Sequence, residues 1–247
     1  MNLLLALVLA QAPAESLGID QRLNETVDAA LAFRDDAGRE IRLGGLLGRR
    51  PVVLAPVYYA CPSLCQQVLN GLAKSLRPVD LRPGADFDVV AFSIDPRETP
   101  AQAEAAKAAV LRRYGRPETA AGWHFLTGEE AAVRALAERI GFRYRYDAAT
   151  GQYAHAAGLM VLTPDGRLAR YFFGLEPSAR DLRLALVEAA EGRIGTLADR
   201  VLLFCLRWDP AKGRYTWAAL GAMRAGGVLT LLAMAAWIGR SLRRRRA

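Results

Sequence analysis

Residues 52–76 read VVLAPVYYACPSLCQQVLNGLAKSL, and the fold of the chain can be argued outward from this stretch. Its first part, residues 52–59, is apolar and rich in β-branched and aromatic residues, which predicts a short buried strand. Its second part, residues 62–76, carries Leu64, Val68, Leu72 and Leu76 at helical spacing, which predicts a helix. Pro62 suits the first helical turn because its missing N–H would have no partner there. The stretch therefore predicts a strand that passes directly into a helix.

The rest of the chain continues this alternation of strands and helices. Two turn sequences, at residues 36–38 and 164–166, predict hairpins. The other elements expected from local patterns are strands at 87–94, 123–126, 158–163 and 169–173, and helices at 101–114, 129–140 and 178–191. Because strands alternate with helices first and a hairpin comes late, we expect an α/β sheet with mixed strand directions.

Two cysteines, Cys61 and Cys65, lie four residues apart where the predicted strand ends and the helix begins. The partial positive charge at a helix N-terminus favours the thiolate form of Cys61. Cys65 follows one helical turn later and shares that face of the helix. Two sulfurs so placed can form a disulfide or bind one soft metal ion. A total of three cysteines is too few for a disulfide-built scaffold.

The chain has only two histidines. His155 lies in the segment GQYAHAAG, residues 151–158, which we interpret as a loop just before a strand. From such a loop the imidazole could reach the thiols across the edge of the sheet, and an imidazole beside thiolates keeps Cu(II) accessible. His124 lies inside a strand-like run and is interpreted as a structural residue. On these residues alone, the cysteine pair is a metal site, a redox site or two unlinked helix-face cysteines.

Residues 57–65, VYYACPSLC, resemble the copper-site segment of the Sco/SenC family of cytochrome oxidase assembly proteins. Residues 93–100, SIDPRETP, look like that family's second signature. His155 falls where the family's copper-binding histidine is expected, and the likeness covers residues 20–192.

This resemblance implies a thioredoxin-like fold with an N-terminal extension, and a copper cargo delivered to the dinuclear copper centre of cytochrome c oxidase. The subunit that carries that centre is then the expected partner, and other copper carriers are possible partners. It also implies that the cysteine pair cycles between dithiol and disulfide. The copper ligands that it implies are Cys61, Cys65 and His155.

Three functions compete at this point. A copper chaperone uses all three residues, whereas a thiol–disulfide oxidoreductase does not need His155. Thioredoxin-type oxidoreductases usually space their cysteines by two residues rather than three, which favours metal binding. For the third, a peroxidase of related fold, the sequence offers no peroxide pocket.

Three further residues lie near the predicted site. We interpret Asp95 as a cap of the turn before Pro96; the alternative is that Asp95 supports the metal site from outside the ligand set. We interpret Tyr58 and Tyr59 as packing residues.

Both ends of the chain suggest a membrane-bound protein with an extracytoplasmic copper domain. Residues 1–14 combine a short apolar run with a small-residue cleavage site and are interpreted as a signal peptide. Residues 217–239 carry Arg224 as their only charge and would span about 35 Å as a helix, enough to cross the hydrocarbon core. The arginine-rich residues 240–247 follow directly, which predicts a cytoplasmic C-terminus.

The segment between the domain and the expected span, residues 193–216, is interpreted as juxtamembrane. It contains the third cysteine, Cys205, which we interpret as a buried apolar side chain. The net charge of +8 does not favour nucleic-acid binding, because five of the positive charges belong to Arg240 and the run 243–246. No basic stripe interleaved with aromatic residues occurs elsewhere.

Overall fold

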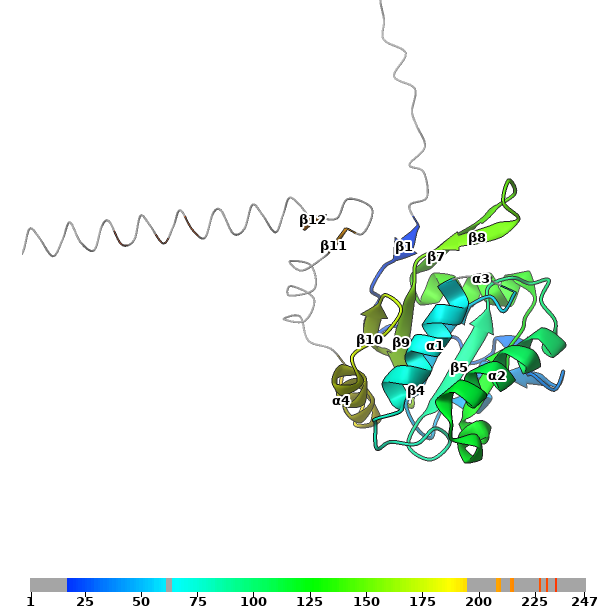
Figure 1. Ribbon diagram of the computed structural model, residues 1–247, viewed down its shortest axis with the longest axis horizontal. Coiled ribbons are helices and arrows are strands. Elements are labelled where there is room, and N and C mark those ends of the chain that lie inside the picture. The colour runs from blue at the N-terminus through cyan, green and yellow to red at the C-terminus, as the bar shows by residue number, and fades with distance from the viewer. Residues whose placement is uncertain are drawn as a thin grey trace, which may run out of the picture. The chain divides into compact units, whose positions relative to one another are not determined.

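Strand β4 (Val52–Val57) lies at the centre of a five-stranded sheet with the order β10-β9-β4-β5-β6 (Figure 1). It pairs in parallel with β5 (Asp88–Ser93), which pairs in parallel with β6 (Trp123–Leu126). On its other side it pairs antiparallel with β9 (Gly158–Leu162). The sheet is completed by β10 (Leu168–Phe173). The expected α/β sheet with mixed strand directions is therefore confirmed.

The computed structural model describes residues 17–60 and 64–194, together with 208–209, 214–215, 227, 230 and 234. The chain divides into two units at residues 194 and 195, and each is described by itself. In the first unit the helices are α1 (Leu64–Leu76), α2 (Pro100–Tyr114), α3 (Glu130–Arg139) and α4 (Ala179–Ala190). Its short elements are β1 (Gly18–Ile19), β2 (Ala32–Arg34), β3 (Glu40–Arg42), η1 (Leu43–Leu46) and η2 (Pro117–Gly122).

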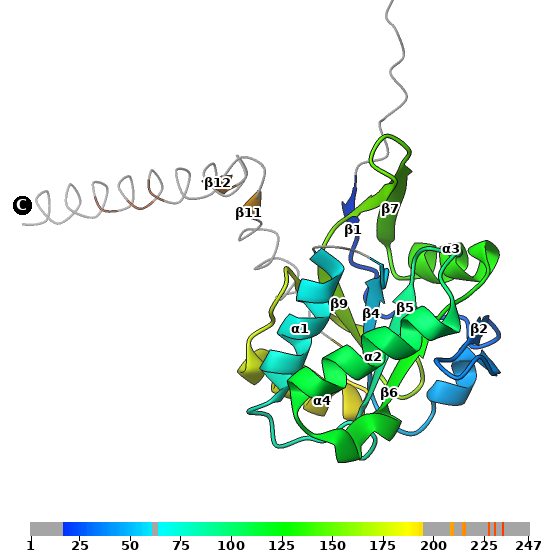
Figure 2. The same ribbon diagram turned by 45° about the vertical axis from the view of Figure 1, so that its right-hand side comes forward.

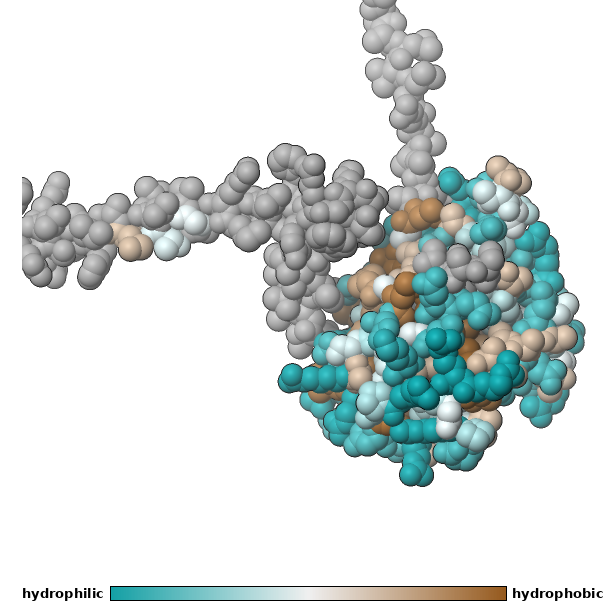
Figure 3. Space-filling model, viewed as in Figure 1, coloured by the Kyte–Doolittle hydropathy of each residue, from teal (hydrophilic) through white to brown (hydrophobic). Residues whose placement is uncertain are grey.

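Helices α1 and α2 cover the same face of the sheet, as the two ribbon views agree (Figures 1 and 2). This follows from the topology, because both connect neighbouring parallel strands and such crossovers are right-handed. Helix α1 buries the predicted stripe of Val68, Leu72 and Leu76, each at most 1% exposed. Every residue of β4 and β5 is buried. The visible outer surface of the unit is largely hydrophilic (Figure 3).

Strands β1, β7 and β8, which lie outside the main sheet, were not expected from the sequence. Strands β7 (Phe142–Asp147) and β8 (Gln152–His155) form an antiparallel hairpin, and β1 pairs with the start of β7. This hairpin extends away from the main sheet (Figure 1). His155 therefore ends a strand, and the interpretation of its surroundings as a loop is wrong. The alternating pattern of Phe142, Tyr144 and Tyr146 with arginines between them is the local signal for this strand.

In the second unit, β11 (Trp208–Asp209) pairs with β12 (Arg214–Tyr215), and residues 227, 230 and 234 are helical. The expected signal peptide, the basic tail and nearly all of the expected juxtamembrane segment and span lie outside the described residues. No helix in the described part of the chain combines the length and hydropathy that a membrane span requires.

Candidate metal centre

The candidate site begins where β4 ends and the chain turns into α1. Cys61 lies outside the described residues, and Cys65 is the second residue of α1. The expectation that Cys65 lies in the helix is thus confirmed for its backbone, and the helix is described from Leu64 onward. The carboxyl ends of the parallel strands β4 and β5 meet at this edge of the sheet, since Val57 is in register with Ser93.

Tyr59 anchors the segment that leads to the cysteines. Its ring is stacked on Phe125 at a centroid distance of 5.7 Å, and its hydroxyl lies 3.1 Å from the Ala91 carbonyl oxygen and 2.8 Å from that of Leu126. Burial, together with the nearby charge of Glu98, raises the pKa of Tyr59 well above its ordinary value. The hydroxyl therefore stays protonated and acts as a hydrogen-bond donor. The interpretation of Tyr59 as a packing residue is confirmed.

The topology brings His155 to the same edge of the sheet. Because β9 is antiparallel to β4, residues just before β9 lie beside residues just after β4. The ring centroids of His155 and Tyr58 are 6.0 Å apart in an edge-to-face arrangement, and those of His155 and Phe142 are 5.7 Å apart. Tyr58 stands three residues before Cys61 in the chain. The structure thus places His155 beside Tyr58, in the stretch of chain that leads from β4 towards the cysteines.

The imidazole of His155 is held in a form that suits metal binding. Its Nδ1 lies 2.9 Å from the backbone carbonyl oxygen of Ala156. When Nδ1 carries the proton and donates to that carbonyl, the lone pair of the neutral ring is on Nε2. Burial lowers the pKa of His155, and the Ala156 carbonyl offsets part of that effect. The neutral imidazole, which is the form that binds metals, is therefore favoured near neutral pH.

A polar cluster supports the aromatic side of the site. Asp95 accepts a hydrogen bond from the backbone N–H of Arg97 at 3.0 Å and pairs with its guanidinium at 2.8 Å. Burial alone would raise the pKa of Asp95, but the bonds from Arg97 outweigh it and lower that pKa. The Tyr153 hydroxyl lies 3.5 Å from the same carboxylate, and the Tyr153 ring packs on Tyr58 at 5.7 Å. Asp95 caps its turn, as expected, and also contacts the aromatic cluster beside His155.

Glu98 is the residue of this site that the sequence did not single out. It is only 8% exposed, and its carboxylate accepts hydrogen bonds from the backbone of Tyr59 and Ala60 just before Cys61. A Glu in a turn after a strand carries no local signal of such a role, because its partners lie about 40 residues away in sequence.

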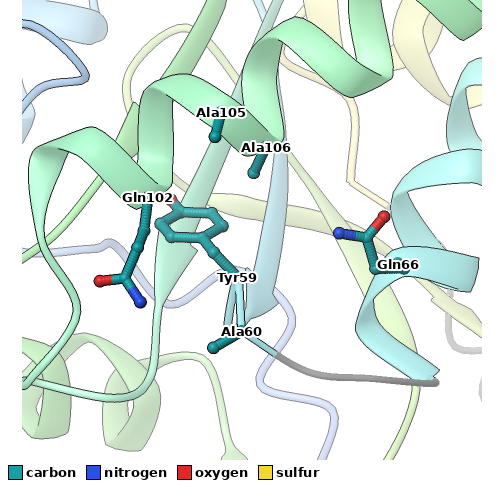
Figure 4. Close-up of a pocket in the computed structure, with 6 residues that line it drawn as sticks. All are labelled: Tyr59, Ala60, Gln66, Gln102, Ala105 and Ala106. Atoms are coloured by element: carbon teal, nitrogen blue, oxygen red, sulfur yellow. The ribbon is translucent and has the colours of Figure 1, made fainter.

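A small cleft of about 200 Å³ lies beside this segment, between α1 and α2. Figure 4 shows Gln66 of α1 and Gln102 of α2 on either side of Tyr59 and Ala60. Two alanines of α2, Ala105 and Ala106, also line the cleft. It is an opening next to the cysteine segment rather than a deep binding pocket.

The other candidate residues lie elsewhere or outside the described chain. His124 is in β6, and its Nε2 lies 3.6 Å from Asp88 Oδ1. Asp88 begins β5, so this contact lies towards the N-terminal ends of the parallel strands, whereas Tyr58 follows the C-terminal end of β4. This agrees with the interpretation of His124 as structural. Cys205 lies outside the described residues. Among the residues that are described, no three His, Cys, Asp or Glu side chains form a group able to hold a metal ion.

A protein-family model described as SCO1/SenC matches residues 19–189. The chain belongs to the SCO1/SenC family. Comparison with curated proteins gives no match. The thioredoxin-like, mixed α/β fold expected from the resemblance is therefore confirmed at the level of the family.

Solved structures of the same fold are numerous. A crystal structure of a protein from Aquifex aeolicus VF5 is 24% identical, with a TM-score of 0.60, and covers 71% of this chain and 98% of its own. A SCO1/SenC family lipoprotein from Bacillus anthracis str. Ames is 18% identical, with a TM-score of 0.56; the alignment covers 69% of this chain and 99% of the lipoprotein. Arabidopsis thaliana ScoI with copper bound is 18% identical, with a TM-score of 0.53; the alignment covers 66% of this chain and 96% of the Arabidopsis chain. At these identities the similarity shows the fold.

Proposed function

We propose that this SCO1/SenC protein binds one copper ion through Cys61, Cys65 and His155. The observation that carries the proposal is the contact between the rings of His155 and Tyr58, because Tyr58 lies three residues before Cys61. Two thiolates and one imidazole form a donor set that suits Cu(I) and also admits Cu(II). The copper bound to the Arabidopsis protein of the same fold supports this choice of metal.

In this proposal the protein is a metallochaperone that delivers its copper to the dinuclear centre of cytochrome c oxidase. The subunit that carries that centre is the partner. Copper here is a cargo, so the site must hold the ion and also release it. A site at the edge of the sheet, close to an open cleft of about 200 Å³, is suited to such transfer because a partner can approach it.

The alternative is a thiol–disulfide oxidoreductase that reduces the cysteines of the copper-receiving partner. Such an enzyme needs Cys61 and Cys65 but has no use for an imidazole beside them. The half-buried position of His155 and its lowered pKa, due to burial, therefore favour metal binding. The two functions make opposite predictions for a variant that lacks only His155.

We also propose that the domain is extracytoplasmic and anchored to the membrane by residues 217–239, with residues 240–247 in the cytoplasm. An oxidising compartment outside the cytoplasm would let the cysteine pair form a disulfide. A member of the family from Bacillus anthracis is a lipoprotein, which is consistent with attachment to a membrane.

Anaerobic titration of the protein with Cu(I) tests the ligand set. We expect one copper per chain, with weaker binding in Cys61→Ser, Cys65→Ser and His155→Ala. The matched control is His124→Ala, which removes the other histidine and should bind copper like the wild type. Unchanged affinity in His155→Ala would refute the three-residue site. If His155→Ala kept full thiol–disulfide activity towards the partner and the wild type bound no copper, the oxidoreductase would replace the chaperone.

A further inference from the structure

Glu98 is a buried carboxylate with an unusual set of partners. It is 8% exposed and lies in the turn between β5 and α2. Its Oε2 accepts from the backbone N–H of Tyr59 at 2.7 Å and from the Ser93 hydroxyl at 2.5 Å, while Oε1 accepts from the backbone N–H of Ala60 at 2.5 Å. Both oxygens are thus engaged by donors from within the protein.

These bonds solve a problem that arises where β4 ends. The pairing of β4 with β5 stops at Val57 and Ser93, so the next backbone N–H groups have no continuing strand beside them. For the N–H of the buried Tyr59, the lack of an acceptor would cost about 1–3 kcal/mol, whereas Ala60 is exposed and its N–H could be solvated instead. Glu98 accepts from two successive peptide groups, those of Tyr59 and Ala60, and so fixes the direction of the chain at the residue before Cys61.

The same turn also contacts the side of the site that carries His155. The guanidinium of Arg97 lies 4.8 Å from the centre of the Tyr146 ring and 5.8 Å from that of Tyr153. The Tyr153 ring packs on Tyr58, which packs on His155. One short turn therefore contacts the backbone of Tyr59 and Ala60 through Glu98, and the β7–β8 hairpin that ends at His155 through Arg97.

We infer that Glu98 is a positioning residue for the metal site, which fixes the approach to Cys61 relative to His155. This inference rests on the proposed copper site. Glu98 acts through the backbone of Tyr59 and Ala60, from which its two oxygens accept hydrogen bonds, and a carboxylate oxygen suits copper(I) less well than a thiolate does. Groups that orient metal ligands in this way typically change metal affinity by about 10–100-fold when they are replaced.

Two substitutions separate the charge of Glu98 from its shape. Glu98→Gln keeps the shape, but its amide nitrogen is a donor and would face a backbone N–H, so one of the two backbone bonds is lost. Glu98→Asp keeps two acceptor oxygens on a shorter side chain. We expect copper affinity to fall in the order wild type, Glu98→Asp, Glu98→Gln, with a loss of about 10–100-fold for the last. The Cu(II)–thiolate absorption band should shift in the same order.

The matched control is Asp35→Asn. Asp35 is also buried, at 7% exposure, and also accepts from two backbone N–H groups, those of Ala37 and Arg39, but it lies in the β2–β3 hairpin. Its replacement should lower stability while leaving copper affinity and the absorption band unchanged. A loss of affinity in Asp35→Asn equal to that in Glu98→Gln would overturn the inference, because the effect would then be one of general stability.

The remaining outcomes are equally decisive. The positioning role would be overturned, and the copper site left intact, if Glu98→Gln had the copper affinity and spectrum of the wild type. The same would follow if Glu98→Gln bound copper more tightly than Glu98→Asp. If Glu98→Gln does not fold, Glu98→Asp is compared with Asp35→Asn: weaker copper binding supports the inference, and equal binding overturns it. Absence of copper binding in the wild type would instead refute the proposed function itself.

Discussion

Replacing Tyr59 by phenylalanine should destabilise the domain by about 1–3 kcal/mol, the cost of leaving buried polar groups without a partner. The hydroxyl is the only group removed, and it lies 3.1 Å and 2.8 Å from the carbonyl oxygens of Ala91 and Leu126. Both of those residues are fully buried strand residues, so water cannot readily replace the lost donor. The ring itself stays, and with it the stacking on Phe125.

Thermal unfolding measures this effect. For a domain of this size about 1 kcal/mol shifts Tm by roughly 2–4 °C, so the expected decrease is about 2–12 °C. Tyr146→Phe is the control, because Tyr146 is 42% exposed and its hydroxyl accepts a long, solvent-exposed hydrogen bond from Arg97 Nη1 at 3.5 Å, which water can replace. It should change stability by less than about 0.5 kcal/mol. Equal Tm values for the two variants would refute the view that the Tyr59 hydroxyl anchors the cysteine segment to the sheet.

Three further predictions concern acid stability, the thiols and topology. Burial alone would raise the pKa of Asp88, but its hydrogen bonds and charge interactions with His124 and Arg50 lower that pKa. The ionised carboxylate therefore stabilises the fold above about pH 4, and this stabilisation is lost as the pH falls further. The difference in Tm between wild type and Asp88→Asn should shrink below about pH 4, and a difference that stays constant would contradict this prediction. Mass spectrometry of the oxidised, metal-free protein should find a Cys61–Cys65 disulfide, and a Cys205 link to either thiol would rule this pairing out. Protease treatment of spheroplasts should digest the domain and spare a C-terminal tag, whereas cleavage of the tag from outside would reverse the topology.

Local sequence patterns were sufficient to predict the strands of the main sheet, although not their order. The apolar run at residues 52–59 and the helical stripe of residues 68, 72 and 76 predict β4 and α1, because burial of one face dictates both periods. The turn at residues 164–166 likewise predicts the β9–β10 hairpin. The conformation of each of these elements is determined by residues close together in the chain, so the pattern of one sequence is enough to predict it.

The surroundings of His155 could not be predicted in the same way. Its identification as a copper ligand rests on the resemblance to the Sco/SenC family, since spacing alone did not connect it to the cysteines. Its contact with Tyr58 depends on the antiparallel placement of β9 beside β4, which brings together residues about 100 positions apart. Its contact with Phe142 depends on the β7–β8 hairpin, which the sequence analysis did not predict. The role of Glu98 was missed for a similar reason, because its hydrogen bonds reach Tyr59 and Ala60 across the sheet edge.

The central claim is that one copper ion is held by two cysteine sulfurs and the imidazole of His155. X-ray absorption of the copper-loaded protein measures the ligand atoms directly. We expect two sulfur scatterers and one imidazole nitrogen in the wild type and in His124→Ala, and loss of the imidazole signal in His155→Ala. An imidazole signal that persists in His155→Ala, or a wild-type copper shell without sulfur, would contradict the account.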